Sequence, residues 1–130
     1  MRQGKDLRAP VTPAPKAFID LTGASGAVYR FERIDDLDRL PSIAGNFVYV
    51  RGKGPAAIVI GVGASDTLRR AGEQLPEAQR LHHAEGLYIR RNVFRRTRAE
   101  EQADIVGRHQ PVMVMAAELD RPAEPPQGRP

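Results

Sequence analysis

Apolar residues along the chain gather in short runs, and their spacing predicts both strands and helices. Residues 45–61, GNFVYVRGKGPAAIVIG, contain two such runs, 47–50 and 57–60, joined by the Gly- and Pro-containing link 52–55. Runs of β-branched and aromatic residues on either side of turn-forming residues predict a β-hairpin. The second run leads into Gly-Val-Gly-Ala-Ser at 61–65. We therefore expect a hairpin that passes directly into a helix.

Two further segments predict strands. Residues 26–34, GAVYRFERI, alternate between two faces, as in a strand with one face mostly covered. Residues 86–94, GLYIRRNVF, predict another strand. The residues at 21–26 are turn formers, and those at 35–40 predict one helical turn before a proline.

The helix after the hairpin is expected to start near Ser65 or Asp66, either of which can cap it. Pro76 must begin a new turn or kink the old one, so a second piece is expected over residues 77–83. The apolar run at 112–115 predicts a short strand or a packed tail.

A last helix is predicted over about residues 98–109 and ends before Pro111. At 100° per residue, four residues share the predicted inward face, with Ile105 on its flank. These four are Ala99, Gln102, Ala103 and Val106. The opposite face is expected to carry Glu100, Asp104 and Arg108, and Glu101 is expected to lie nearer to it than to the inward face.

Together these elements predict an α+β fold, in which a small mixed or antiparallel β-sheet, a β-hairpin plus additional strands, carries packed helices. The Pro-rich residues 1–16 lack an apolar period and predict a flexible arm. Residues 117–130 are similar and predict a disordered tail, which leaves one folded domain over residues 17–116.

Composition narrows the chemistry and the expected location. The 130-residue chain has no cysteine, which excludes disulfides, thiolate catalysis and metal–sulfur sites. It has no apolar run of membrane-spanning length, and its first residues lack the hydrophobic core of a signal peptide. These features predict a cytoplasmic protein without a membrane partner.

Charge points mildly towards a polyanionic partner. Lysine and arginine total 20 against 16 acidic residues, a formal charge of +4. Arginine supplies most of the positive charge and carries a planar fork that suits phosphate, so we expect nucleic acid, DNA more than RNA. A charge of this size is also ordinary for a solubilising surface.

Five arginines stand within residues 90–98 and have the strongest claim to binding. They are Arg90, Arg91, Arg95, Arg96 and Arg98. Phosphate contacts from such a set would give an affinity that falls with salt. Alternatively, the arginines are solvent-exposed residues of an edge strand, where charged side chains prevent aggregation.

The Gly61-x-Gly63 pattern between a strand and a helix is similar to a dinucleotide-binding fingerprint. Asp66 stands where the third glycine would be, and no clear parallel βαβ unit follows. Nucleotide binding is therefore not expected.

Four short motifs occur in a suggestive order. The hairpin strand 44–50 carries Phe47 or Tyr49 at an aromatic position, and the second strand, 58–61, ends in glycine. Arg69 or Arg70 follows in a helix, and residues 105–111 read Ile-Val-Gly-Arg-His-Gln-Pro.

This order, over about residues 20–115, resembles the GIY-YIG endonuclease superfamily, and residues 21–31 resemble an extra N-terminal strand of a bacterial subgroup. The resemblance implies a sheet with packed helices and Mg²⁺-dependent hydrolysis of phosphodiesters. It assigns catalytic positions to Phe47 or Tyr49, to Arg69 or Arg70, and to Gln102.

Two departures from the family pattern change the expected function. The family's metal-binding glutamate lies three residues before the Leu-Ile pair, where this chain has Gln102, and the tyrosine of the second strand is missing. Mg²⁺ usually needs at least one carboxylate, and a neutral amide brings no charge to the site. We expect a catalytically degraded nuclease, a pseudoenzyme without a cofactor, that binds nucleic acid through its basic surface.

Two alternatives stay open. In the first, the protein is an active endonuclease, in which Tyr49 and Arg69 or Arg70 act with Mg²⁺ held by a shifted ligand, Glu101. In the second, it is a protein-interaction module without a nucleic-acid role. In that case the aromatic residues of the hairpin are ordinary core side chains, and the helix arginines are a solvated face.

Overall fold

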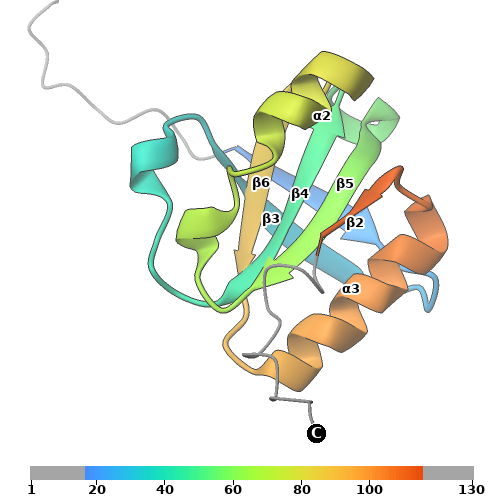
Figure 1. The fold of residues 1–130 in the computed structure, drawn as a ribbon. Helices are drawn as coiled ribbons and strands as arrows, with labels where there is room; N and C mark the ends of the chain where they lie inside the picture. Colours follow the sequence, from blue (N-terminus) through green and yellow to red (C-terminus); the bar gives the residue numbers. More distant parts are fainter. Residues whose placement is uncertain (1–16, 116–130) are drawn as a thin grey trace, which may run out of the picture.

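The computed structural model describes residues 17–115, which form a sheet with two α-helices (Figure 1). The expected arm at 1–16 and tail at 117–130 lie outside the described residues. The strands are β2 (Phe18–Thr22), β3 (Val28–Ile34), β4 (Gly45–Arg51), β5 (Ile58–Ser65), β6 (Gly86–Arg91) and β7 (Met113–Val114). The helices are α2 (Leu75–His82) and α3 (Arg95–His109), and short 3-10 turns occupy η1 (Leu37–Arg39), η2 (Gly54–Ala56) and η3 (Leu68–Arg70).

The strands form one open sheet in the order β2-β3-β6-β4-β5-β7. All neighbours are antiparallel except β5 and β7, which run parallel. The α+β class is therefore confirmed. Strand β6 follows the hairpin in the chain but inserts between β3 and β4, so it is an inner strand. The alternative of an arginine-bearing edge strand is thus wrong.

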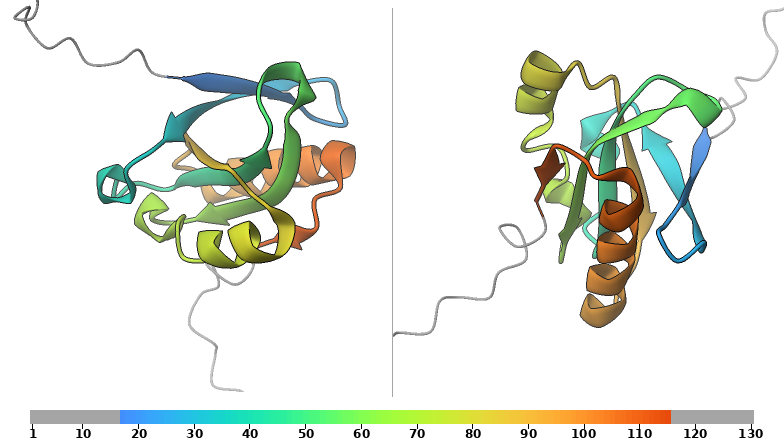
Figure 2. Two further views of the ribbon diagram at one scale, coloured as in Figure 1. Left: turned by 90° about the horizontal axis from the view of Figure 1, so that it is seen from above. Right: turned by 90° about the vertical axis from the view of Figure 1, so that its right-hand side faces the viewer.

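The two helices cover opposite faces of the sheet (Figure 2). On one face, α2 and η3 pack over side chains of β4, β5 and β6. On the other, α3 packs against β5 and also contacts β4 and β2. Its Ile105 joins a core cluster with side chains of β2, β3, β4, β5 and β6. No helix within the described residues is both long and apolar enough to cross a membrane.

The predicted hairpin is confirmed as β4 and β5, and it forms the centre of the fold. Residues 45–50 of β4 are all buried, because each face of the strand has its own core. This double burial explains why the run 47–50 is continuously apolar rather than alternating.

Strand β5 is longer than expected, because Gly61 and Gly63 belong to the strand and not to a turn. A Cβ on Gly63 would lie 2.2 Å from the Phe47 ring, and one on Gly61 would lie 3.1 Å from the Tyr49 ring. The Gly-x-Gly pattern therefore makes room for two aromatic rings across the hairpin.

The prediction of a helix that starts at Ser65 or Asp66 is wrong. Ser65 ends β5, and η3 follows as a single turn in which the Thr67 hydroxyl accepts a hydrogen bond from the Arg69 amide. The α-helix begins at Leu75, with Pro76 in its first turn, where the missing amide hydrogen is not needed. The second predicted piece, 77–83, thus corresponds to α2.

The other boundaries shift by a few residues. Strand β6 ends at Arg91 rather than at residue 94, and α3 begins earlier than predicted, at Arg95. Strand β2 falls partly in the segment 21–26 that the sequence predicts as a turn, because the turn starts only after Thr22. The single turn after β3 and the short final strand are confirmed as η1 and β7.

Replacement of Gly63 by alanine should destabilise the protein by at least about 2 kcal/mol, because the new methyl group must displace the buried Phe47 ring. Urea unfolding measures this difference. Gly107→Ala on exposed α3 is the matched control, since its new methyl group would meet only the Ala24 methyl at 3.3 Å. We expect the control to change stability by less than about 1 kcal/mol. Equal effects of the two substitutions would contradict the proposed role of Gly63.

Candidate functional site

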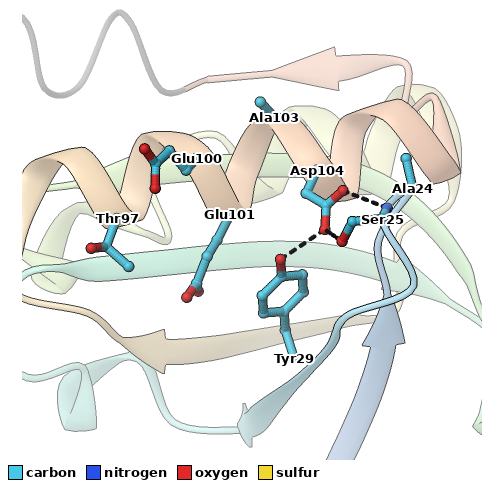
Figure 3. Close-up of a pocket in the computed structure, with 8 residues that line it drawn as sticks. All are labelled: Ala24, Ser25, Tyr29, Thr97, Glu100, Glu101, Ala103 and Asp104. Atoms are coloured by element: carbon cyan, nitrogen blue, oxygen red, sulfur yellow. Dashed lines mark hydrogen bonds between the residues drawn. The ribbon is translucent and has the colours of Figure 1, made fainter.

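A shallow hollow lies between α3 and the turn that joins β2 to β3 (Figure 3). Residues of α3, of the turn and of β3 line it. The lining residues are Ala24, Ser25, Tyr29, Thr97, Glu100, Glu101, Ala103 and Asp104.

Asp104 anchors α3 to the β2–β3 turn. Its carboxylate accepts hydrogen bonds from the Ser25 amide at 2.8 Å, the Ser25 hydroxyl at 2.6 Å and the Tyr29 hydroxyl at 2.7 Å (Figure 3). The Ala24 amide also donates to the Asp104 main-chain carbonyl, at 2.9 Å. A Cβ on Gly23 would fall on the same carboxylate, so the turn requires a glycine where it meets Asp104.

These bonds shift the pKa values of both titratable partners. Hydrogen bonds lower the pKa of Asp104, because they favour its charged form. The bond from the Ser25 side chain has the largest effect and the bond from Tyr29 the next largest. The hydrogen bond to Asp104 raises the pKa of Tyr29. At neutral pH the pair is therefore a carboxylate and a neutral phenol, with the phenol as donor.

A second group of polar contacts joins β6 to α3. The Glu101 carboxylate accepts from Arg90 Nε at 2.8 Å and from Asn92 Nδ2 at 3.0 Å. The Arg90 guanidinium also lies over the Tyr29 ring, 5.4 Å from its centroid. Tyr29 and Arg90 therefore connect the two carboxylates: Arg90 binds Glu101 and lies over the ring of Tyr29, whose hydroxyl binds Asp104.

The network continues to the connection between β6 and α3. Asn46, fully buried on β4, donates to the Arg98 carbonyl at 3.0 Å and accepts from Asn92 at 2.9 Å. The Arg98 guanidinium donates to the carbonyls of Asn92 and Val93, at 3.2 and 3.0 Å. Buried polar groups satisfied in this way hold the connection in one conformation.

The inward face of α3 differs from the predicted one. Arg98, Gln102 and Ile105 are buried, so the predicted burial of Gln102 is confirmed. Ala99 and Ala103 are exposed, so their predicted burial is wrong. Glu101 binds Arg90 of β6 and Asp104 binds the β2–β3 turn, so the outward positions predicted for these two residues are wrong as well. The cause is the polar network, which stabilises Arg98, Glu101 and Asp104 on the protein side of the helix and leaves small residues outside.

The five arginines of 90–98 divide into two groups. Arg90 is paired with Glu101, and Arg98 is 3% exposed and bonded to main-chain carbonyls, so both serve the fold. Arg91, Arg95 and Arg96 remain exposed. Arg91 pairs with Glu32, at 3.4 Å, and Arg96 pairs with Glu100, at 3.2 Å.

Two exposed apolar side chains stand among these arginines. They are Val93 and Phe94, in the connection between β6 and α3, and sequence reasoning assigned them to a strand. We call Arg91, Val93, Phe94, Arg95 and Arg96 the junction surface. The signal that could have identified it is the end of the continuous apolar run 87–89, which is followed by two arginines and an asparagine.

The residues given catalytic positions by the resemblance are divided between the two faces of the sheet. Phe47 and Tyr49 are buried on the α2 face, where the Tyr49 hydroxyl donates to the Ala71 carbonyl and burial raises its pKa. Gln102 belongs to α3, on the other face, and donates to the Val62 carbonyl at 3.4 Å. Glu101 lies on that same helix and is held by Arg90.

The two arginines of η3 lie on the same face as Phe47 and Tyr49, because Ala71, whose carbonyl binds the Tyr49 hydroxyl, directly follows this turn. The Arg69 guanidinium donates to the Leu40 carbonyl, and Arg70 pairs with Glu73. Both are exposed. Within residues 17–115, no three His, Asp or Glu side chains lie close enough together to hold a metal ion.

Comparisons with known proteins identify no relative: no protein-family model, no curated protein and no solved structure matches this chain.

The Asp104 anchor should make the stability of the fold depend on pH in the acidic range. Because its pKa is lowered in the folded state, the stabilisation is present above the unfolded pKa and is lost as pH falls from about 5 through the folded pKa. Asp104→Asn removes this titration, so its urea midpoint should fall less between pH 5 and pH 3 than that of the native protein. Asp66→Asn, at an exposed loop position, should keep the native pH dependence. Parallel pH profiles for Asp104→Asn and the native protein would refute the anchor.

The Arg90–Glu101 pair should stabilise the fold more than the Arg96–Glu100 pair. The side chains of the first pair are 31% and 14% exposed, and those of the second are 91% and 66% exposed. Double-mutant cycles to alanine measure both couplings by urea unfolding. We expect about 1–2 kcal/mol for the first pair and less than about 0.5 kcal/mol for the second. Similar couplings would show that burial does not strengthen the first pair.

Proposed function

We propose that the protein binds nucleic acid through the junction surface and does not cleave it. The observation that carries this proposal is the exposure of Arg91, Arg95 and Arg96 together, on a connection that the buried Asn46 and Arg98 hold in place. Guanidinium groups on a fixed backbone can meet phosphates without a large loss of conformational freedom.

The charge at the start of α3 favours an anionic partner. The first turn of the helix contains no acidic residue, and Phe94 supplies no side-chain cap. Acidic residues would normally stabilise this end, because the helix dipole makes it positive. Arg95 and Arg96 add to that positive potential instead. The start of α3 is therefore less stable than one that carries acidic residues, and a phosphate bound there would stabilise it.

The ion pairs of Arg91 and Arg96 do not prevent binding. Both arginine side chains are mostly exposed, and exposed pairs contribute little to stability. A phosphate can therefore replace Glu32 or Glu100 as the partner at small cost. The paired carboxylates lower the local net charge, which predicts modest rather than tight binding at physiological salt.

The resemblance to the GIY-YIG superfamily is compatible with this function. The order of a hairpin, a helix, a strand beside the hairpin and a last helix agrees with the pattern that the sequence suggested. Binding without hydrolysis is favoured because Tyr49 and Gln102 lie on opposite faces of the sheet and Glu101 already neutralises Arg90. Mg²⁺ and a catalytic role of Glu101 belong only to the alternative of an active endonuclease. The cytoplasm remains the compartment that we propose.

Binding of a fluorescently labelled DNA duplex, measured by anisotropy at several salt concentrations, tests this function. Arg91→Ala combined with Arg95→Ala and Arg96→Ala should reduce the slope of log affinity against log salt by about one for each arginine–phosphate interaction that the substitutions remove. Arg69→Ala with Arg70→Ala, on the exposed turn of the other face, is the control and should keep at least most of the slope.

Each contrary result has a meaning of its own. An equal loss of slope in the control would show that the arginines of η3 contribute as much to binding as those of the junction surface. Cleavage of the duplex in Mg²⁺ would support the active endonuclease. Absence of DNA and RNA binding even at low salt would refute the proposal and favour a protein-interaction module.

A further inference from the structure

We infer that the junction surface prefers single-stranded nucleic acid and that Phe94 stacks on an unpaired base. This inference rests on the proposed function and adds the class of nucleic acid. The observation that carries it is the exposure of the Phe94 side chain, which contacts between arginines and phosphates do not explain.

Phe94 is the most exposed of the large hydrophobic residues that the structure describes. Its side chain is 72% exposed, and the neighbouring Val93 is 54% exposed. An aromatic ring left in water contributes nothing to the core, although burial of such a ring is worth several times the thermal energy. Neighbouring exposed apolar residues within a charged surface mark an interaction site more often than scattered single ones.

The backbone that carries the ring is held firmly. The Phe94 carbonyl accepts from the Arg98 amide at 2.9 Å, at the first turn of α3. The Arg98 guanidinium binds the two preceding carbonyls, those of Asn92 and Val93. The main chain that carries the ring is therefore held from inside the fold, and a ligand would not need to order a loop.

The chemistry of the surroundings selects a nucleic acid with unpaired bases. Arg91 precedes the ring in the chain and Arg95 and Arg96 follow it, so phosphates and a base can be contacted together. A flat aromatic ring among cationic groups is the usual arrangement for binding single strands, because every base offers a π-face. In a duplex these faces are already covered by neighbouring bases.

A second exposed phenylalanine provides a matched comparison. Phe18 on the edge strand β2 is 50% exposed, but the guanidinium of Arg30 lies over its ring, 5.3 Å from the centroid. That arginine is paired with Asp20 at 2.9 Å. One face of the Phe18 ring is thus occupied within the protein, and Phe18 lacks the run of arginines that flanks Phe94 in the chain.

The test uses the full chain with three ligands of equal length: oligothymidine, a DNA duplex and an abasic single strand. Phe94→Ala should weaken oligothymidine binding about tenfold and leave duplex and abasic binding within about twofold, as expected for contacts made by the arginines alone. Phe18→Ala should change none of the three. Urea unfolding checks that both variants keep the native stability, which is expected because both side chains are exposed.

A second variant tests stacking directly. The chain contains no tryptophan, so Phe94→Trp introduces a single indole whose fluorescence should be quenched by oligothymidine and unchanged by the abasic strand. Equal losses on all three ligands in Phe94→Ala, or no quenching of the indole by oligothymidine, would overturn the inference while the proposed function stands. Failure of the native protein to bind any ligand would overturn both.

Discussion

Burial of β4 on both faces is the constraint on which the rest of the structure depends. Phe47 and Tyr49 point to one side and Val48 and Val50 to the other, so each side needs its own cover. The segment η3–α2 covers the first and α3 the second. Strand β6 pairs with β4 between the hairpin and β3, and the chain passes from its last arginines through a short connection to α3. The junction surface is thus a consequence of how the central strand is covered.

The attachment of α3 is unusual in its polarity. Ile105 is its only fully buried large apolar side chain, and Gln102, Arg98, Glu101 and Asp104 make most of the other described contacts. Hydrogen bonds add modestly to stability when satisfied, but their geometry is demanding. The polar attachment therefore gives the helix a defined position and direction, which an apolar stripe of the same size would leave less certain.

Sequence reasoning predicted the parts of this fold that depend on apolar pattern and failed where polar contacts decide. The hairpin was predictable because continuous apolar runs leave few alternatives. The inward face of α3 was not, because its alanines look apolar whereas its charged residues become internal only through partners far along the chain, such as Tyr29 and Arg90. Gly61 and Gly63 misled for a similar reason. Their role is to receive the rings of Tyr49 and Phe47, which local sequence cannot reveal.

The same reasoning explains why a count of arginines overstates a binding surface. Arg90 and Arg98 are separated from Arg91 and Arg96 by the direction of the strand and the phase of the helix, and those geometries send the first two inward. Inside the fold, Arg98 holds the carbonyls of Asn92 and Val93, and Arg90 binds the carboxylate of Glu101. A rigid connection with fewer exposed charges can still be selective, because selectivity depends on what stands between the charges. In the function proposed above, the residue between the charges is Phe94, whose exposed ring would distinguish the junction surface from a merely basic one.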